Sequence, residues 1–481
     1  MLRLSCKHLL IAMVCSSTAH MASAETLARI YELAVANDPV LKAAEASFKA
    51  SSEAKNLARA ALLPQVNGSY SYSKNDVDSS TIGLTRPPGG DPTDFAGLIS
   101  GPVTSQDETD TKSLNIELQQ NIFNLPAWYS FKQGKRLSEL AAAQFAFDQQ
   151  DLIVRVAEAY FNVLRAKENL DTAIAEETAI QRQLEQTEQR FEVGLIAITD
   201  VHESRAAHDL AVVTRLEAEG QLGIAYEALS VITGEQHSNI WLLSEEFPVT
   251  DPSPAQRSEW VDFALENNYQ LRAARLSENA AQHNARAKRA EHLPKIVGSY
   301  SYVDSTTEGD RPTDSVFNPD PTVDDSRDGG TIGLSLSMPL FSGGSVSASR
   351  RQAAQEYIQA RENHIASQRN TIQNTRSLHL SVITDVGKVK ARKQAITSSE
   401  SALEATQAGY EVGTRNIVDV LDAQRFLFRS VRDYSNARYD YVINMLRLKQ
   451  QAGTLTPQEI YSLSKWLAEP AAPAASTTPK G

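Results

Sequence analysis

The sequence predicts a mixed helical and β-strand membrane protein that is built from two long internal repeats. Two pairs of similar segments support this prediction. Residues 62–73 (LLPQVNGSYSYS) return as residues 292–303 (HLPKIVGSYSYV), 230 positions later. Residues 193–204 (VGLIAITDVHES) return as residues 412–423 (VGTRNIVDVLDA), 219 positions later. A period this long indicates a duplicated structural unit and not a short-period solenoid. Each copy contains strand-like and long helix-like segments.

Two windows without proline predict the long helices. They span residues 127–247 and 341–456, and apolar residues recur in them at three- and four-residue spacing, as on one face of a helix. Each window is interrupted once, at Gly194 and at Gly413, where one helix ends and the next begins. Each repeat therefore contains two helices folded back on each other. The first of them, at 127–193, would be about 100 Å long.

The strand-like segments argue against a cytosolic coiled coil, which the helices alone would also fit. Apolar and polar residues alternate in four segments: 66–73, 114–122, 296–302 and 332–340. One apolar and one polar face is the pattern of a membrane β-barrel strand, although a soluble sandwich shows the same alternation. The strands of each pair are expected to be joined by long polar connections, at 74–111 and 304–328. Since the smallest membrane barrels have about eight strands, four strands leave edges that require partner chains.

The first 24 residues are interpreted as a secretory signal peptide. They combine the cations Arg3 and Lys7, a short apolar run and an Ala-Ser-Ala cleavage site, so the mature chain is expected to begin at Glu25. The apolar run is too short for a membrane anchor, and Cys15 has a poor context for lipid attachment. Because Cys6 and Cys15 are the two cysteines of the protein, the mature chain has neither disulfide nor thiol chemistry.

Charge and hydropathy argue against a nucleic-acid-binding protein and against a membrane protein with transmembrane helices. Cleavage of the signal takes the net charge from −12 to about −14, and an acidic chain is a poor partner for nucleic acid, because phosphate binding requires clusters of Lys and Arg. No second apolar stretch approaches 18 residues. Any membrane crossing by the mature chain therefore uses β-strands.

Five segments follow from these features. They are the signal peptide at 1–24, the first repeat at 25–234, an inter-repeat equatorial segment at 235–262, the second repeat at 263–453 and a C-terminal equatorial segment with a tail at 454–481. Each repeat is expected to contain a helix, a strand pair and a long helical hairpin. The Ala/Pro/Thr-rich tail from Pro470 is expected to be disordered.

Over essentially all of the mature sequence, the chain resembles the TolC family of outer-membrane efflux proteins of Gram-negative bacteria. The resemblance rests on these stretches: ETLARIYELAVANDPVL at 25–41, LQQNIFNLPAW at 118–128, RFEVGLIAITDV at 190–201, AGYEVGTRNIVDVLDA at 408–423 and NARYDYVINMLRLK at 436–449. It implies a homotrimer in the outer membrane, with a 12-stranded β-barrel, four strands per chain, continued by a long periplasmic α-helical barrel. It also implies passive, gated export of small molecules, proteins or both. The implied partners are a periplasmic adaptor (membrane fusion) protein, an inner-membrane RND, ABC or MFS transporter, and outer-membrane lipid.

The resemblance further implies a gate latch at the helix tips. In this latch Tyr410 and Arg415 of the second repeat would bond Asp200 and Thr199 of the first. Arg415 suits the role because its planar guanidinium can hold a carboxylate and a hydroxyl together. Breaking these links would let the inner helices swing outward and the closed tip dilate. The alternative interpretation is a packing aromatic and an exposed cation at a helix tip.

Two acids and three tip residues complete the predicted site. Asp419 and Asp422 are three positions apart on a predicted helix, so both carboxylates point to one face. In a trimer six such carboxylates would surround one axis, where two at about 6 Å repel by roughly 2–3 kcal/mol at an effective dielectric near 20. The resemblance implies that this acidic entrance ring favours cations; the alternative is ordinary helix-start acids. Gly194, Leu195 and Gly413 form the tips where adaptor proteins would dock, and glycine there would also simply end a helix.

No catalytic residue, metal site or cofactor is predicted. The chain lacks the H-E-x-x-H, G-x-S-x-G and Gly-rich phosphate-loop motifs, and His364 and His379 are expected on helix surfaces.

The family's further link at the gate would join Gln183 to an acid, but Gln407 stands at the position of that acid, so the link is neutral at best. A trimeric coiled-coil surface protein or adhesin is the alternative function, and it leaves the two separated strand pairs unexplained.

Overall fold

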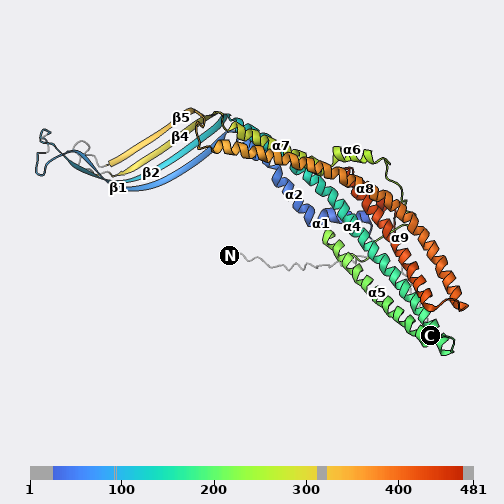
Figure 1. The fold of residues 1–481 in the computed structure, drawn as a ribbon. Helices are drawn as coiled ribbons and strands as arrows, with labels where there is room; N and C mark the ends of the chain where they lie inside the picture. The colour runs from blue at the N-terminus through green and yellow to red at the C-terminus, as the bar shows by residue number, and fades with distance from the viewer. Residues whose placement is uncertain (1–24, 92, 94, 311, 313–321, 470–481) are drawn as a thin grey trace, which may run out of the picture. The chain divides into compact units, whose positions relative to one another are not determined.

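The computed structural model describes residues 25–91, 93, 95–310, 312 and 322–469 (Figure 1). The predicted signal peptide and the tail from Pro470 lie outside these residues. The chain divides into two compact units. One comprises Met1–Ala46, Phe145–Leu271 and Gln368–Gly481, and the other comprises Ser47–Gln144 and Arg272–Ser367. None of the described helices is both long enough and apolar enough to cross a membrane.

Long helical hairpins follow each strand pair, as predicted. The first consists of α4 (Leu125–Glu192) and α5 (Ile198–Thr233), and the second of α8 (Ser345–Glu411) and α9 (Ile417–Gln451). The remaining helices are shorter than those of the hairpins: α1 (Leu27–Asn37), α2 (Pro39–Ser52), α3 (Ala54–Ala60), α6 (Arg257–Asn267), α7 (Tyr269–Ala290) and α10 (Pro457–Ser464). At 68 residues, α4 is about 100 Å long, which agrees with the sequence-based expectation.

Four long strands form one antiparallel sheet in the order β1-β2-β4-β5. Their bounds are β1 (Gln65–Thr85), β2 (Ile99–Phe123), β4 (Lys295–Asp310) and β5 (Thr322–Ser337). In this sheet β1 and β5 are the edges, each paired on one side only. A second sheet pairs the short strands β3 (Leu242–Leu243) and β6 (Leu467–Ala468).

The predicted long connections within the strand pairs, at 74–111 and 304–328, were wrong. Strand β1 continues to Thr85 and β2 begins at Ile99; β4 continues to Asp310 and β5 begins at Thr322. These outer parts are mostly polar and show no regular apolar alternation, so the sequence pattern could not reveal them. Their backbones pair all the same, and polar side chains interact across the strands. Lys74 Nζ lies 3.6 Å from Glu108.

The strand register places the apolar residues on one face of the sheet. Val66 lies opposite Leu118, Leu118 opposite Tyr300, and Tyr300 opposite Ile332. In the single chain this face is open, with Ile332 85% exposed. The register between β2 and β4 shifts between Asn121 and Phe123, which indicates a β-bulge close to the end of β2.

The buried core of the first unit lies between α4 and α9, with α1 and the β3–β6 sheet packed against it. Tyr160 and Phe161 of α4 are fully buried. The Phe161 ring lies 5.8 Å from that of Tyr439 on α9 and 5.7 Å from that of Tyr160. Arg165 and Asp440 join the same two helices with an ion pair of 2.5 Å.

Candidate functional site at the helix tips

The first hairpin, between α4 and α5, turns through a glycine-dependent backbone motif. The amide of Gly194 donates to the Phe191 carbonyl at 2.8 Å, and the amide of Leu195 donates to the Arg190 carbonyl at 2.9 Å. This pair of hydrogen bonds is the Schellman motif. Gly194 has a φ of +77°, a conformation that favours glycine. Leu195 is 68% exposed.

The second hairpin, between α8 and α9, turns through the same motif. The amide of Gly413 donates to the Tyr410 carbonyl at 3.1 Å, and that of Thr414 donates to the Gly409 carbonyl at 2.9 Å. Gly413 also has a φ of +77°. A Cβ on Gly409 would lie 2.8 Å from Cγ of Arg415, so the Arg415 side chain folds back over the last turn of α8.

The predicted acidic residues begin α9. The Asp419 amide donates to Oδ1 of Asn416 at 2.8 Å, and the Asn416 amide donates to Oδ2 of Asp419 at 3.3 Å. These two bonds form a capping box, so within the chain Asp419 serves as a helix-start acid. Asp422 is exposed and lies 3.3 Å from Nη1 of Arg425. Both acids therefore have a basic or backbone partner in a single protomer.

The four predicted latch residues make local contacts in the single protomer. Thr199 donates to the adjacent Asp200 at 3.3 Å, and Nη1 of Arg415 lies 3.8 Å from Asp419. The guanidinium of Arg190 lies 4.8 Å from the centre of the Tyr410 ring. Within the described part of the chain, the Tyr410 hydroxyl is buried without a hydrogen-bond partner. The structure thus does not bring Tyr410 and Arg415 into contact with Asp200 and Thr199.

A groove runs between α4, α5 and α9 above these turns. Its volume is about 430 Å³, and Glu176, Arg425 and Arg432 are among the residues that line it. Burial raises the pKa of Glu176, although Arg425 and Arg432 act in the opposite direction. In the same region Gln183 is buried on α4 and Gln407 is half-buried on α8. No hydrogen bond joins these two amides among the contacts of the described residues.

The expectation that both named histidines lie on helix surfaces was wrong for His379. This residue is 3% exposed, because residues of the segment before α6 cover it. Burial lowers the pKa of His379, although a hydrogen bond from its ring to the Ala255 backbone acts in the opposite direction. His364 is half-buried and pairs with Glu278 at 2.7 Å. Neither histidine joins a metal-binding group, and the described ranges contain no cluster of three or more His, Cys, Asp or Glu side chains that could hold a metal ion.

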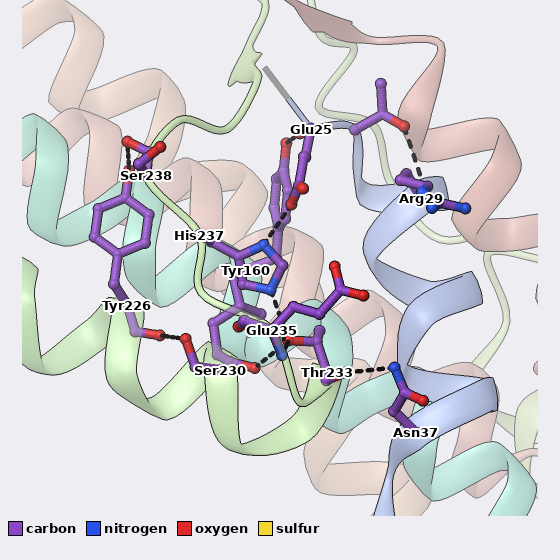
Figure 2. Close-up of polar contacts among 12 residues, drawn as sticks. Glu25, Arg29, Asn37, Tyr160, Tyr226, Ser230, Thr233, Glu235, His237 and Ser238 are labelled. Carbon is purple, nitrogen blue, oxygen red and sulfur yellow. Dashed lines mark hydrogen bonds and ion pairs between the residues drawn. The ribbon is translucent and has the colours of Figure 1, made fainter. Parts of the chain in front are cut away.

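Sequence reasoning missed a polar cluster around His237, which Figure 2 shows between Glu25 and Thr233. The His237 side chain is fully buried and its Nδ1 pairs with the Glu25 carboxylate. Its Nε2 lies 2.6 Å from Oγ1 of Thr233, and Asn37 donates to the Thr233 carbonyl at 2.9 Å. The Glu25 backbone amide also donates to the backbone carbonyl of Asn239 at 3.1 Å. The cluster thus ties the predicted mature start to the segment after α5.

The comparisons with known proteins agree with this architecture. The sequence model of a family described as outer membrane efflux protein matches residues 30–235 and 260–454. The chain is 36% identical to the outer membrane protein TolC of Vibrio cholerae over 92% of this chain and 94% of that protein. It is 33% identical to TolC of Escherichia coli over 96% and 89%.

A solved structure with a similar fold is that of the Campylobacter jejuni CmeC outer membrane channel. The two folds align with a TM-score of 0.69 and 16% sequence identity, over 92% of this chain and 90% of that one. The family model thus matches most of both predicted repeats, and the two relatives align over more than nine-tenths of the chain. The chain belongs to the outer membrane efflux protein family.

Proposed function

We propose that three copies of this chain assemble into a passive export duct through the outer membrane. The open four-stranded sheet carries this proposal, because its edges β1 and β5 lack partners within the described chain and exposed edges pair with further strands. Three copies would contribute twelve strands, enough to close a barrel. The four strands of one copy are too few, because the smallest membrane barrels have about eight strands. The repeated order of helices and strands supports an origin by duplication.

The helical hairpins would continue the barrel as a periplasmic tunnel. Export energy would come from an inner-membrane RND, ABC or MFS transporter, coupled through a periplasmic adaptor that docks at Gly194, Leu195 and Gly413. The exposure of Leu195 at 68% supports such docking, since an apolar side chain at a tip is available to a partner. The duct would carry small molecules, proteins or both, without chemistry of its own.

The gate would be closed in the assembly by links from Tyr410 and Arg415 to Asp200 and Thr199. Two observations support this proposal. The Tyr410 hydroxyl is buried without a partner, and such a donor gains from a new acceptor. The Arg415 guanidinium is 61% exposed and only loosely paired with Asp419, so it is free to bond a second group. Asp419 and Asp422 of three copies would form the acidic entrance ring.

Single-channel conductance in planar bilayers under a salt gradient tests the duct and the latch together. The purified protein would be compared with Tyr410→Phe/Arg415→Ser. We expect a small, cation-selective conductance that rises severalfold in the double variant, because the links holding the tip closed are removed. The matched control is Tyr357→Phe/Arg361→Ser, the same chemistry on α8 but outside the tip, where Arg361 pairs with Glu362. Its conductance should equal that of the unmodified protein.

The outcomes separate the two proposals. Equal conductance in both double variants would retain the duct and reject the latch assignment. Absence of conductance from every correctly assembled protein would reject the duct and favour the structural trimer. Loss of cation preference in Asp419→Asn/Asp422→Asn, with unchanged conductance at high salt, is expected if the acidic ring controls entry.

A further inference from the structure

We propose that a notch in the apolar face of the sheet is a seat for one acyl chain of a membrane phospholipid. This inference rests on the proposed placement of the four strands in the outer membrane. The notch has a volume of about 490 Å³. Its lining comes from three adjacent strands: Leu118, Gln120 and Ile122 of β2, Gly298, Ser299 and Tyr300 of β4, and Ile332, Gly333 and Leu334 of β5.

Gly298 creates the notch because it contributes no side chain to its row on the apolar face of the sheet. The register places Gly298 between Gln120 and Leu334, in the row next to the one formed by Leu118, Tyr300 and Ile332. A Cβ on Gly298 would point into the notch and lie 3.2 Å from Cδ1 of Ile122. The bulge after Asn121 lets the Ile122 side chain close this end.

The one side-chain amide at the notch, that of Gln120, already has hydrogen-bond partners. The Gln120 side-chain amide donates to the Leu62 carbonyl at 3.0 Å and to the Asn121 carbonyl at 2.8 Å. The Tyr300 ring lies along Gly330, where a Cβ would meet its hydroxyl at 2.8 Å. Apart from the hydroxyls of Ser299 and Tyr300, an occupant therefore meets mostly apolar side chains and glycine, which suits a hydrocarbon chain and penalises a strongly polar ligand.

The occupant is a lipid and not a second copy of the chain, because strand pairing uses the edge of β5 and leaves its faces open. Ile332 and Leu334 are 85% and 72% exposed, and a strand added beside β5 would extend the apolar face. The notch also lies close to the end of β2 at Phe123, from which the chain enters α4. With the helices in the periplasm, this end of the strands meets the periplasmic leaflet, which supplies phospholipid.

The first repeat offers a matched control. Gly68 is the counterpart of Gly298, 230 positions earlier, and lies on the same face, opposite Ile116. A Cβ on Gly68 would meet no atom within 4 Å. Gly68 therefore has open space around it and no neighbouring side chains that would form a notch. A larger residue at that position should not affect a bound acyl chain.

The test is native mass spectrometry of the protein extracted from phosphatidylethanolamine-containing membranes in mild detergent. We expect about one phospholipid retained per chain, and about tenfold less in Gly298→Leu, equivalent to about 1.4 kcal/mol. Gly68→Leu should retain the lipid as the unmodified protein does. Gly298→Ala repeats the test with the smallest change, since only the end of Ile122 has to move, and should give an intermediate loss.

Conductance measured on the same preparations separates failure of the seat from failure of the duct. Equal retention in Gly298→Leu and Gly68→Leu, or no retained lipid in the unmodified protein, with normal conductance throughout, would overturn the seat and leave the duct standing. A protein that neither conducts nor inserts into bilayers would reject the placement of the strands, and the seat with it. Occupation by the neighbouring copy would appear as a loss of assembly in Gly298→Leu without any loss of lipid, and would also overturn the seat.

Discussion

Glycine at the two helix tips is required by backbone conformation and not by space. A Cβ on Gly194 or Gly413 would meet nothing within 4 Å, yet both residues have a φ of +77°. We therefore expect Gly194→Ala and Gly413→Ala each to destabilise its turn by about 1 kcal/mol. Faster hydrogen exchange at the amides of Leu195 and Thr414, which close the two Schellman motifs, would measure this.

The control for the tip glycines is Gly220→Ala in the middle of α5. Gly220 also has open space for a Cβ but lies in a regular helix. Alanine should stabilise this helix by about 0.5–1 kcal/mol, the opposite sign. Equal effects at Gly194 and Gly220 would contradict the requirement for the left-handed conformation.

The buried acid Asp38 should make stability depend on pH. Its side chain is 2% exposed and lies 2.8 Å from Nη2 of Arg155. Burial disfavours its charge, but hydrogen bonds from Arg155 and the Leu41 amide outweigh burial and hold the pKa of Asp38 below its usual value. Since the folded pKa is lowered, the stabilisation is present above pH about 4 and is lost as the pH falls through the folded pKa.

We expect Asp38→Asn to lower the free energy of unfolding by about 2 kcal/mol at pH 7 and by much less at pH 3. Denaturant midpoints at the two pH values would measure both effects. Asp151→Asn is the control, because Asp151 bonds the same Arg155 from an exposed position and should cost less than about 1 kcal/mol. A pH-independent cost in Asp38→Asn would refute the ionised pair.

Sequence reasoning located residues whose role is local and missed those whose partners are distant. Gly194 and Gly413 were predictable because a helix that ends in a left-handed turn selects glycine. The start of α9 at Asp419 was predictable from the helix dipole. The contact of Glu25 with His237 was not, since 212 positions separate the two residues and no periodic pattern connects them.

At the scale of elements, the contact between α4 and α9 should depend on a few aromatic side chains. Phe161 is fully buried between the rings of Tyr160 and Tyr439. Phe161→Ala should therefore destabilise the protein by about 3–5 kcal/mol through lost burial and the cavity left behind. Phe426→Ala, at a ring that is 59% exposed, should cost far less, and comparable thermal midpoints for the two variants would contradict this assignment.

The helices were easier to predict than the strands for a physical reason. Long proline-free runs with a helical period reveal both ends of α4 within two residues. Strand β1 extends 12 residues beyond the alternating segment 66–73, to Thr85, and β2 begins 15 residues before the segment 114–122, at Ile99. Backbone pairing continues there although most of the side chains are polar. The hydroxyl oxygens of Ser79 and Ser105, for example, lie 2.8 Å apart across the two strands, in a region expected to be a loop.

At the scale of the whole molecule, the open edges β1 and β5 predict an obligatory assembly. We expect native mass spectrometry of the mature protein to show three copies and no stable monomer, because an unpaired edge of this length promotes association. Small-angle scattering would give an independent mass in solution. A soluble monomer as the main species would contradict the closure of a barrel from three sheets.

The lack of cysteine after residue 24 turns the exposed tips into attachment points for spectroscopic probes. A single thiol introduced at Leu195 or at Val412, which are 68% and 75% exposed, would be unique in the mature chain. A spin label there would report the distances between neighbouring copies directly. The motion of the gate thereby becomes a length that can be followed in the membrane while a partner binds.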